Sequence, residues 1–474
     1  MRQRQVCLWR RTEHLVQPIR HDRGHAPKAK ARLQKEVLAS APVSTFVVKL
    51  ARMPVNAMLP TAIATRLEAA AASKPPPQQP DTPPDEPSML IDAVTDYTSL
   101  LASPPSQLAA WPCSSASYHV TRLLGKGAFA ACFAARKTSA WEAPSRVALK
   151  VLPRYSTKAS RELEVNKLLR NAPGVAPRLF EFFYLLGSGD SKTCHLVMAM
   201  EAYDTDLRAL LRRWAAAAAE HRPSWLHLAR RAGQQLAPAL AHLHGLGILH
   251  RDLKTDNCLV KLGGASMPSD DGAPPPTALR HARFVLSDFG HAKIITPSSP
   301  PHNNPQSTAY AFAPFFRAPE LFFGCATYTS APDVWALCCT LSEVLLGGAA
   351  LFDPDDDDDG DGIPSSDPNG ELSDAQRQLL ALFDGLGTPS WPEVVAMNPA
   401  LDRAESGWRM RAWMGMPPRP PTRPWAARLA EAIAEEEDDG AEAEAAIAML
   451  GKVFVFEPEK RPTAASLSKS AFLL

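Results

Sequence analysis

The stretch 248–260 reads ILHRDLKTDNCLV and decides how the rest of this 474-residue chain is interpreted. It begins and ends with apolar residues, which predicts a loop held between two buried anchors. Between these anchors lie five polar residues at fixed offsets, namely His250, Arg251, Asp252, Lys254 and Asn257. A solvated connecting loop has no need of this set, so the pattern indicates a catalytic loop.

The spacing of these residues suits phosphoryl transfer. A carboxylate such as Asp252 can accept the proton of an attacking hydroxyl group, and an amide such as Asn257 can hold a metal ion. The stretch matches the pattern H-R-D-x-x-x-x-N at every fixed position. With these residues the chain resembles the eukaryotic protein kinase family. The resemblance implies a two-lobed α+β fold, in which an antiparallel-sheet lobe with one helix precedes a larger, mainly helical lobe.

Composition and charge narrow the possible functions. A hydrophobic content of 45% suffices for a large core, and the net charge of +1 gives no overall field that would attract nucleic acid or a membrane surface. The eight cysteines show no metal-ligand pattern, which favours a reducing compartment. No apolar run reaches the roughly 18 residues that a membrane span needs. We expect a cytoplasmic or nuclear protein with no nucleic-acid partner and no membrane span.

The N-terminal region differs in composition from the rest of the chain. Met1–Lys35 carries ten Lys and Arg against two acidic residues and has no apolar core of a secretory signal. It is either a solvated basic tail or a nuclear or organellar targeting segment. Thr45–Ala70 has partial helical periodicity, and Lys74–Ser88 has seven prolines in fifteen residues, which predicts an extended linker. We predict that residues 1–116 are largely disordered and that the folded domain starts near Ser117.

A glycine-rich segment follows the start of the predicted domain. Leu124–Cys132 reads LGKGAFAAC and resembles the G-x-G-x-x-G-x-V hairpin that covers ATP phosphates, with Ala130 at the third glycine and Cys132 at the valine. Gly125 and Gly127 matter most, because side chains there would keep backbone N–H groups away from the phosphates.

The run V-A-L-K, about twenty residues later, ends at Lys150, which the resemblance pairs with the α- and β-phosphates of ATP. The helical stretch Arg161–Leu169 offers two acidic residues as the partner of this lysine. The partner should lie four residues before an inward-facing apolar residue on one helix face. Glu164 satisfies this condition with Leu168, whereas Glu162 precedes a polar residue, so we choose Glu164.

The resemblance implies an ATP site between the lobes. A buried strand ends at Met200, and the backbone of the hinge Glu201–Tyr203 would meet the adenine. Leu259 would close the adenine pocket from below, opposite Cys132 and Ala148. The implied nucleotide-binding residues are Leu124, Gly125, Lys126, Gly127, Cys132, Ala148, Lys150, Glu164, Met200, Glu201, Tyr203, Leu259 and Asp288.

The D-F-G motif begins at Asp288, which the resemblance assigns, with Asn257, to holding Mg²⁺. The family has about a dozen residues in the hairpin between these two positions, whereas this chain has many more. Residues 263–280 are rich in Gly, Pro, Ser and Asp, which predicts a disordered excursion from the hairpin. A second, acidic insertion is predicted near residues 353–371.

The candidate activation segment, His291–Arg317, leads into an A-P-E element whose Glu320 should pair with Arg461. Thr308 and Tyr310 are candidate phosphorylation sites. Ala313 stands where Ser/Thr kinases usually place a threonine that contacts the catalytic Asp and Lys, and this departure leaves catalytic competence and proline-directed specificity open.

Two further motifs connect the chain to the CMGC group, which contains the cyclin-dependent and mitogen-activated kinases. Asp333 begins a match to the buried helix that anchors the catalytic loop. Residues 373–394 resemble the insert of this group, with Leu386–Pro389 (LGTP) as its most specific part. The resemblance covers residues 117–474, divided into a small lobe (117–200), a hinge (201–203) and a large lobe (204–474).

The sequence therefore predicts an ATP-dependent protein serine/threonine kinase that acts on protein substrates and has a possible regulatory or docking partner. Lys254 favours Ser/Thr over Tyr acceptors, since tyrosine kinases usually lack a lysine there. The catalytic residues are Asp252, Lys254, Lys150 and Asn257, and Mg²⁺ and ATP are the implied cofactors. Two rival hypotheses are a pseudokinase scaffold, favoured by Ala130, Cys132 and Ala313, and a small-molecule kinase, which the A-P-E and LGTP elements oppose.

Overall fold

The structure is a computed structural model that describes residues 90–92, 110–112, 117–127, 130–137, 146–152, 157–186, 194–217, 223–263, 272–295, 312–325, 329–354, 374–403, 418–434 and 440–474. The described residues belong to one compact unit of the chain, within Ala51–Leu474. The predicted helix within Thr45–Ala70, the sites Thr308 and Tyr310, and most of the acidic insertion lie outside the described residues.

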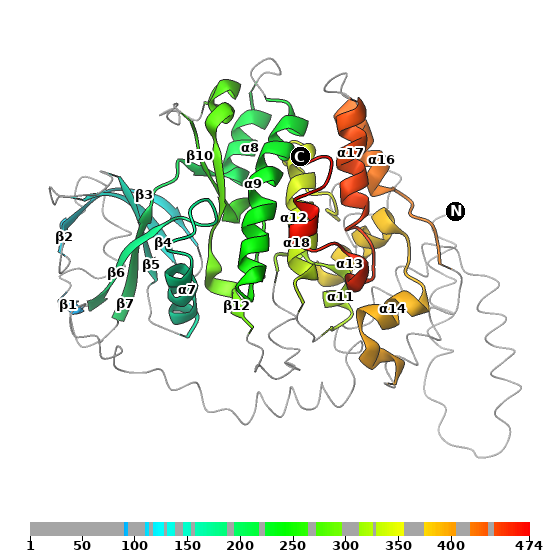
Figure 1. The fold of residues 1–474 in the computed structure, drawn as a ribbon, viewed down its shortest axis with the longest axis horizontal. Coiled ribbons are helices and arrows are strands. Elements are labelled where there is room, and N and C mark those ends of the chain that lie inside the picture. The colour runs from blue at the N-terminus through cyan, green and yellow to red at the C-terminus, as the bar shows by residue number, and fades with distance from the viewer. Residues whose placement is uncertain are drawn as a thin grey trace, which may run out of the picture. The chain divides into compact units, whose positions relative to one another are not determined.

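A seven-stranded sheet forms the small lobe (Figure 1). Its strand order is β1-β6-β7-β5-β4-β3-β2. The five central strands pair antiparallel and are β3 (Ser117–Lys126), β4 (Ala131–Lys137), β5 (Val147–Leu152), β6 (Leu179–Leu186) and β7 (Cys194–Glu201). Alternate apolar side chains of these strands, among them Tyr118, Phe133 and Leu149, form a buried core because successive residues of a strand face opposite sides of the sheet.

Two short strands upstream of the predicted domain start extend this sheet. Strand β2 (Ala110–Pro112) pairs antiparallel with β3, and β1 (Leu90–Asp92) pairs parallel with β6. Both strands lie outside the predicted domain of residues 117–474, and the bounds of that domain stay a prediction. Three-residue strands are too short to show the alternation by which strands are recognised in a sequence, and a proline closes one of them.

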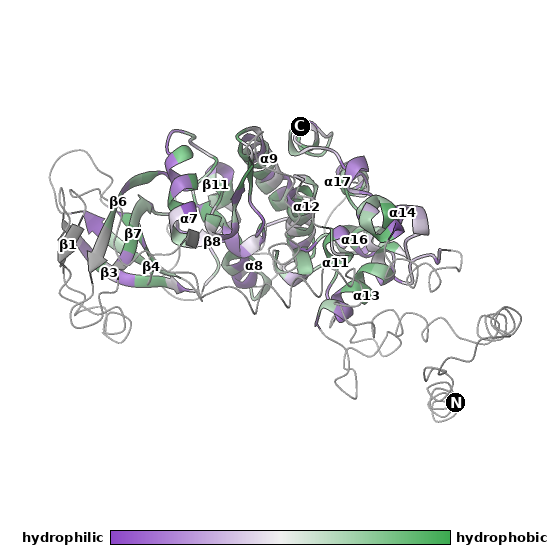
Figure 2. Ribbon diagram, turned by 90° about the horizontal axis from the view of Figure 1, so that it is seen from below, coloured by the Kyte–Doolittle hydropathy of each residue, from purple (hydrophilic) through white to green (hydrophobic). Residues whose placement is uncertain are grey.

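Helix α7 (Thr157–Leu168) lies against the sheet and begins four residues before the predicted helical stretch. Its residues are mixed polar and apolar (Figure 2), and its buried face includes Ala159 and Leu163. The helix also packs against the short 3-10 helix η6 (Phe289–His291), which belongs to the large lobe. Segments from both lobes thus meet beside the D-F-G motif.

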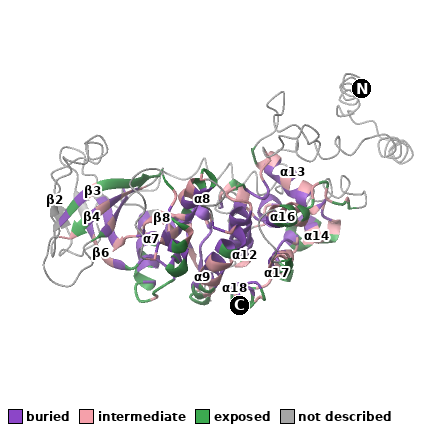
Figure 3. Cartoon of the chain, turned by 90° about the horizontal axis from the view of Figure 1, so that it is seen from above, coloured by how far each residue is buried: buried purple, intermediate pink, exposed green. Residues whose placement is uncertain are grey.

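The large lobe is built around α9 (Trp225–Gly245) and α12 (Ala331–Leu345), which pack against each other. Helix α12 is almost entirely buried (Figure 3). The other described helices of the lobe are α8 (Leu207–Ala215), α11 (Pro319–Phe322), α13 (Asp374–Leu386), α14 (Trp391–Met397), α16 (Trp425–Ala434), α17 (Gly440–Gly451) and α18 (Ala464–Leu467). The predicted two-lobed α+β architecture is confirmed. Among the described residues, no helix has the length and apolarity to cross a membrane.

The predicted hairpin after the catalytic loop is present, but its return segment differs from the prediction. Strands β10 (Cys258–Lys261) and β11 (Arg283–Leu286) pair antiparallel, as expected. The structure describes residues 272–280 of the predicted disordered excursion, and they contain most of the 3-10 helix η5 (Pro276–His281). The buried indole N–H of Trp214 donates to the carbonyl of Pro274 at 2.8 Å. A buried N–H needs an acceptor, and the excursion supplies it, which ties this segment to α8.

Candidate active site

The catalytic loop brings three of the predicted catalytic residues together. Strand β9 (Ile248–Leu249) leads into the loop, and the 3-10 helix η4 (Thr255–Asn257) follows the catalytic Asp. The side-chain amide of Asn257 donates to the backbone carbonyl of Asp252 at 2.7 Å and to its carboxylate at 3.0 Å. The ammonium of Lys254 lies 3.3 Å from the same carboxylate. A carboxylate held between an ammonium and an amide has a defined orientation, which a proton acceptor requires.

Asp333 of α12 anchors the first half of this loop, as predicted. Its carboxylate is 1% exposed and accepts the backbone N–H groups of His250 and Arg251, each at 2.8 Å. A ring nitrogen of His244, on α9, lies 3.0 Å away. Burial alone would raise the pKa of Asp333, but the hydrogen bond and charge of His244 keep it below its usual value. The contact with His244 was not predicted from the sequence.

Lys150 of β5 meets two carboxylates. Its ammonium lies 3.0 Å from Asp288 and 2.5 Å from Glu162. Burial alone would lower the pKa of Lys150, but these two carboxylates raise it above its usual value. Burial alone would raise the pKa of Asp288, but Lys150 lowers it to about 2. Lys150 and Asp288 are therefore both charged near neutral pH.

The prediction that Glu164 pairs with Lys150 is wrong. Glu164 is exposed on α7, and Leu168, the apolar residue on which the prediction depended, is 53% exposed. The buried face of the helix instead carries Glu162 together with Ala159 and Asn166, at intervals of three and four residues. The polar Asn166 faces inward because its amide donates to the backbone carbonyl of Glu162 at 2.9 Å.

Ser287 joins the catalytic loop to the D-F-G motif. Its N–H and hydroxyl both donate to the backbone carbonyl of Asn257, at 2.8 and 3.0 Å, and its own carbonyl lies 3.0 Å from a ring nitrogen of His250. The His250 ring also lies 5.3 Å from that of Phe289, which is buried. The residue that follows Ser287 is Asp288. The structure thus brings the two pairs, Lys150 with Asp288 and Asp252 with Asn257, into one site.

The residues predicted to hold Mg²⁺ fit that ion. Mg²⁺ is commonly bound through one or two carboxylates together with substrate phosphates. The described residues contain no cluster of three metal-ligating side chains, so an all-protein cage is absent from this part of the chain. The Asp288 side chain is 44% exposed, and the Asn257 amide donates through its nitrogen, which leaves its side-chain oxygen as a ligand atom. A carboxylate and an amide oxygen are suitable ligands for Mg²⁺.

The glycine-rich hairpin is open to solvent. Leu124, Gly125, Lys126 and Gly127 are exposed, and the Gly127 N–H donates to the Ala130 carbonyl at 2.9 Å. A Cβ atom added at Gly125 would meet no protein atom within 4 Å. The protein itself therefore imposes no steric need for glycine there, whereas a phosphate close to the backbone would.

The predicted adenine-facing residues lie on neighbouring strands. Ala148 of β5 is directly opposite Met200 of β7, and the next strand, β4, carries Cys132. Leu259 lies on β10, in the large lobe. These four apolar side chains are all partly exposed, unlike the buried core around them. Their assignment to an adenine pocket stays a prediction.

The hinge contains an ion cluster that the sequence did not reveal. The carboxylate of Glu201 lies 2.8 Å from Lys261 and 2.7 Å from Arg283. These two cations are directly opposite each other on β10 and β11, where like charges repel. Burial alone would raise the pKa of Glu201, but the two cations lower it below its usual value. The Glu201 side chain thus tethers the hinge to the large lobe. Tyr203, the third predicted hinge residue, is buried.

The A-P-E element is fixed by a buried ion pair, as predicted. The guanidinium of Arg461 donates to both carboxylate oxygens of Glu320, at 2.7 and 2.8 Å. It also donates to the backbone carbonyls of Val455 and Phe456. The paired geometry of two parallel hydrogen bonds orients both side chains, which fixes the end of the activation segment to the C-terminal part of the lobe.

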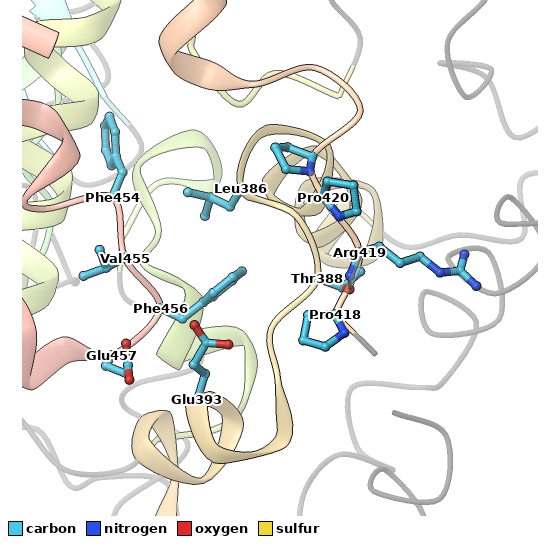
Figure 4. Close-up of a pocket in the computed structure, with 11 residues that line it drawn as sticks. Leu386, Thr388, Glu393, Pro418, Arg419, Pro420, Phe454, Val455, Phe456 and Glu457 are labelled. Atoms are coloured by element: carbon cyan, nitrogen blue, oxygen red, sulfur yellow. Dashed lines mark hydrogen bonds between the residues drawn. The ribbon is translucent and has the colours of Figure 1, made fainter. Parts of the chain in front are cut away.

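A separate pocket of about 410 Å³ lies in the large lobe (Figure 4). Apolar side chains such as Leu386 and Phe456 line it, and the Arg419 side chain points away from it. Gly387 has a φ of +81°, and a Cβ there would lie 2.4 Å from the Arg419 carbonyl. This close approach explains the glycine of the LGTP element. The pocket contains no residue of the predicted catalytic site.

Comparison with known families identifies the fold. The model of the protein kinase domain matches residues 118–473. The chain belongs to the protein kinase family. This protein kinase also contains the motifs of the predicted catalytic site within the matched region, so the family recognised from the sequence is confirmed.

Curated relatives of this protein kinase include two yeast enzymes. The chain is 29% identical to "Protein kinase gsk31" of Schizosaccharomyces pombe over 60% of its own length and 61% of the relative. It is 32% identical to "Protein kinase MCK1" of Saccharomyces cerevisiae over 59% of its length and 62% of the relative. It is 25% identical to "Probable serine/threonine-protein kinase glkA" of Dictyostelium discoideum, over 75% of its own length and 58% of the relative. The chain spans about three fifths of the length of these relatives. The predicted resemblance to the CMGC group is confirmed.

Two neighbouring acidic residues of α7 provide a direct test of the Lys150 contact. We expect Glu162→Gln to raise the KM for ATP and lower kcat, with kcat/KM falling by about ten- to a hundredfold, because Lys150 loses a charged partner that orients it. Glu164→Gln changes the same chemical group on the exposed face and should leave both parameters unchanged. Steady-state kinetics of the two variants decide the matter, and equal losses would contradict the pairing.

Proposed function

We propose that the chain is an ATP- and Mg²⁺-dependent protein kinase that phosphorylates Ser and Thr hydroxyl groups of proteins. The observation that carries the proposal is the meeting of two charged pairs in one site, Lys150 with Asp288 and Asp252 with Asn257. Membership of the protein kinase family supports the same activity. Two of the relatives carry only the name protein kinase, and the third is named a probable serine/threonine-protein kinase.

The geometry suggests a division of roles. Asp252 accepts the proton of the substrate hydroxyl, and Lys254, 3.3 Å from it, stabilises the negative charge of the transferring phosphoryl group. Lys150 binds the α- and β-phosphates. Asn257 and Asp288 would hold Mg²⁺, which neutralises charge on the phosphates when bound. The protein thus contributes mainly positioning and electrostatic stabilisation.

The end of the activation segment favours a proline after the acceptor residue. Phe312 has a φ of +71°, which is rare for a residue with a side chain, and its carbonyl accepts a hydrogen bond from Arg317 at 3.1 Å. We propose that this backbone lies beside the substrate residue that follows the acceptor. Arg317 occupies one of the two lone pairs of this carbonyl, which makes the carbonyl a weaker acceptor for a substrate N–H. A substrate N–H without a good acceptor costs free energy, and proline avoids this cost because it has no N–H group.

The proposal is tested by γ-phosphate transfer from ATP to peptides. We expect the purified chain to phosphorylate a Ser-Pro peptide, and to do so better than the matched Ser-Ala peptide. Asp288→Ala should abolish incorporation, because it removes the carboxylate that holds the metal. Equal incorporation by the wild type and Asp288→Ala would refute the catalytic assignment. Equal rates on the two peptides would refute the proline preference alone.

A pseudokinase scaffold is the rival function that one observation favours. Ala313 has no hydroxyl group to reach Asp252 and Lys254, so that one contact usual in Ser/Thr kinases is missing. Nucleotide binding without phosphate transfer by the wild type would establish this alternative. The four charged and polar residues of the site oppose it, because a scaffold does not need them in this arrangement.

A further inference from the structure

A second buried carboxylate of α12 contacts the catalytic loop. Glu343 is 0% exposed, and its two oxygens lie 3.1 and 2.9 Å from the hydroxyl of Thr255, which is also fully buried. The guanidinium of Arg208, on α8, donates to the same carboxylate. Burial raises the pKa of Glu343, and the cation and the hydroxyl act against this effect. A buried carboxylate requires such donors.

Thr255 is the first residue of η4, the turn that presents Asn257 to Asp252. The same turn is closed by the N–H of Asn257, which donates to the Lys254 carbonyl at 3.0 Å. Fixing the Thr255 side chain therefore fixes the start of a turn whose other end carries a catalytic amide. A one-turn 3-10 helix has few hydrogen bonds of its own, so an outside contact has a large influence on its position.

Helix α12 contacts the loop at two separate points. Asp333 holds the backbone of the first half, and Glu343, ten residues later in the same helix, holds Thr255 in the second half. Ten residues of α-helix extend about 15 Å. The two contacts are thus far enough apart to fix the orientation of the loop as well as its location.

We propose that Thr255 is a positioning residue. Its hydroxyl, bound to Glu343, sets the second half of the catalytic loop and the orientation of Asn257 towards Asp252, and Arg208 in turn holds Glu343. The inference rests on the proposed kinase function for its kinetic consequence. Its structural consequence, a loop held in place before any ligand binds, is independent of that function. A purely structural role, in which the hydroxyl only satisfies a buried carboxylate, makes different predictions for kcat.

Two pairs of variants, matched in size, isolate the hydroxyl group. Wild-type Thr255 is compared with Thr255→Val, and Thr255→Ser with Thr255→Ala, so that each pair differs by the hydroxyl. Either pair suffices if a member of the other does not fold. Thr340→Val is the control, because Thr340 is a fully buried threonine of α12 whose hydroxyl donates to the Ala336 carbonyl of the same helix, at 2.8 Å.

The first measurement is amide hydrogen exchange of the peptide covering residues 250–262 in the ligand-free full chain. The second is steady-state kinetics with varied ATP, Mg²⁺ and peptide. We expect Thr255→Val and Thr255→Ala to exchange faster in this peptide and to lower kcat by about tenfold or more, the range found when groups that orient metal ligands are removed. The KM for the peptide should not change, and Thr255→Ser should behave as the wild type does.

Each outcome decides a specific point. Loss of thermal stability without any change in exchange of residues 250–262 or in kcat would overturn the proposal, because the hydroxyl would then serve only the buried carboxylate. An equal fall of kcat in Thr340→Val would also overturn it. If the wild type transfers no phosphate, the proposed function fails, and hydrogen exchange alone still decides whether Thr255 positions the loop.

Discussion

Replacing Asp252 by Asn is expected to lower kcat by about a thousandfold, within the range for loss of a positioned general base. The amide is nearly isosteric with the carboxylate and keeps an oxygen for Lys254, so the loop should retain its structure. It cannot take the proton of the attacking hydroxyl group at neutral pH. Initial rates of γ-phosphate transfer at saturating ATP and peptide measure the effect, and nucleotide binding followed by thermal shift should be unchanged.

The control for this substitution lies in the same loop. Asp256 is exposed in η4, so Asp256→Asn removes a carboxylate of the same loop without touching the proton acceptor. We expect this variant to keep wild-type kcat. Equal rates for Asp252→Asn and Asp256→Asn would show that neither carboxylate is the base.

The second large effect is expected at Asp333. Asp333→Asn should lower the free energy of unfolding by about 3–5 kcal/mol, the usual cost of removing one partner from a buried charged network. The amide has one oxygen where the carboxylate has two, so the N–H groups of His250 and Arg251 and the ring of His244 can no longer all be satisfied. Urea denaturation monitored by circular dichroism measures this loss, and kcat should fall with it because the catalytic loop loses its anchor.

The effect of Asp333 depends on pH in a defined direction. The pKa of Asp333 in the folded protein lies below the usual value. The contribution of this carboxylate to the free energy of unfolding is therefore complete above about pH 5 and is lost as the pH falls through the folded-state pKa. The stability difference between wild type and Asp333→Asn should therefore shrink on acidification. Asp374→Asn, at a side chain that is 86% exposed, is the control and should be nearly neutral at every pH. A constant difference down to pH 3 would contradict the assigned charge.

The sequence predicted most of the catalytic centre because its motifs set backbone offsets. Asp252 and Asn257 lie in one short loop, so their five-residue spacing nearly determines their contact. Lys150 and Asp288 are far apart in the chain, but each ends a strand-like run in a recognisable motif. The motifs therefore carried long-range information that periodicity alone does not contain.

The wrong pairing of Glu164 and the contacts that were not predicted depend on helix phase or on tertiary packing. Glu162 and Glu164 are two residues apart, and their opposite faces follow from where α7 begins, which a short helical pattern does not define well. The contact of Thr255 with Glu343 joins residues 88 positions apart and has no local signal. The buried Asn166 shows why polarity misled the prediction: an inward-facing amide can be satisfied by the helix backbone.

Two features of the fold had no clear signal in the sequence, for a related reason. Residues 272–280 have the composition of a disordered segment, but their backbone supplies acceptors to α8, including the carbonyl bound by Trp214. Strands β1 and β2 join the sheet at its edges through backbone pairing, which depends little on side-chain composition. Composition indicates how much apolar surface a segment can bury. It does not indicate which neighbouring donors will form hydrogen bonds with the carbonyl groups of that segment.

The buried pair of Glu320 and Arg461 has an evolutionary consequence. A change at one of these positions alone leaves an uncompensated charge in the interior, which usually costs several kcal/mol, about 3–5 by mutational precedent. Simultaneous replacement of both by apolar residues of similar volume costs little. Substitutions at the two positions should therefore covary among descendants of this gene. A variant with only one of the two changes should be selected against unless the other position changes as well.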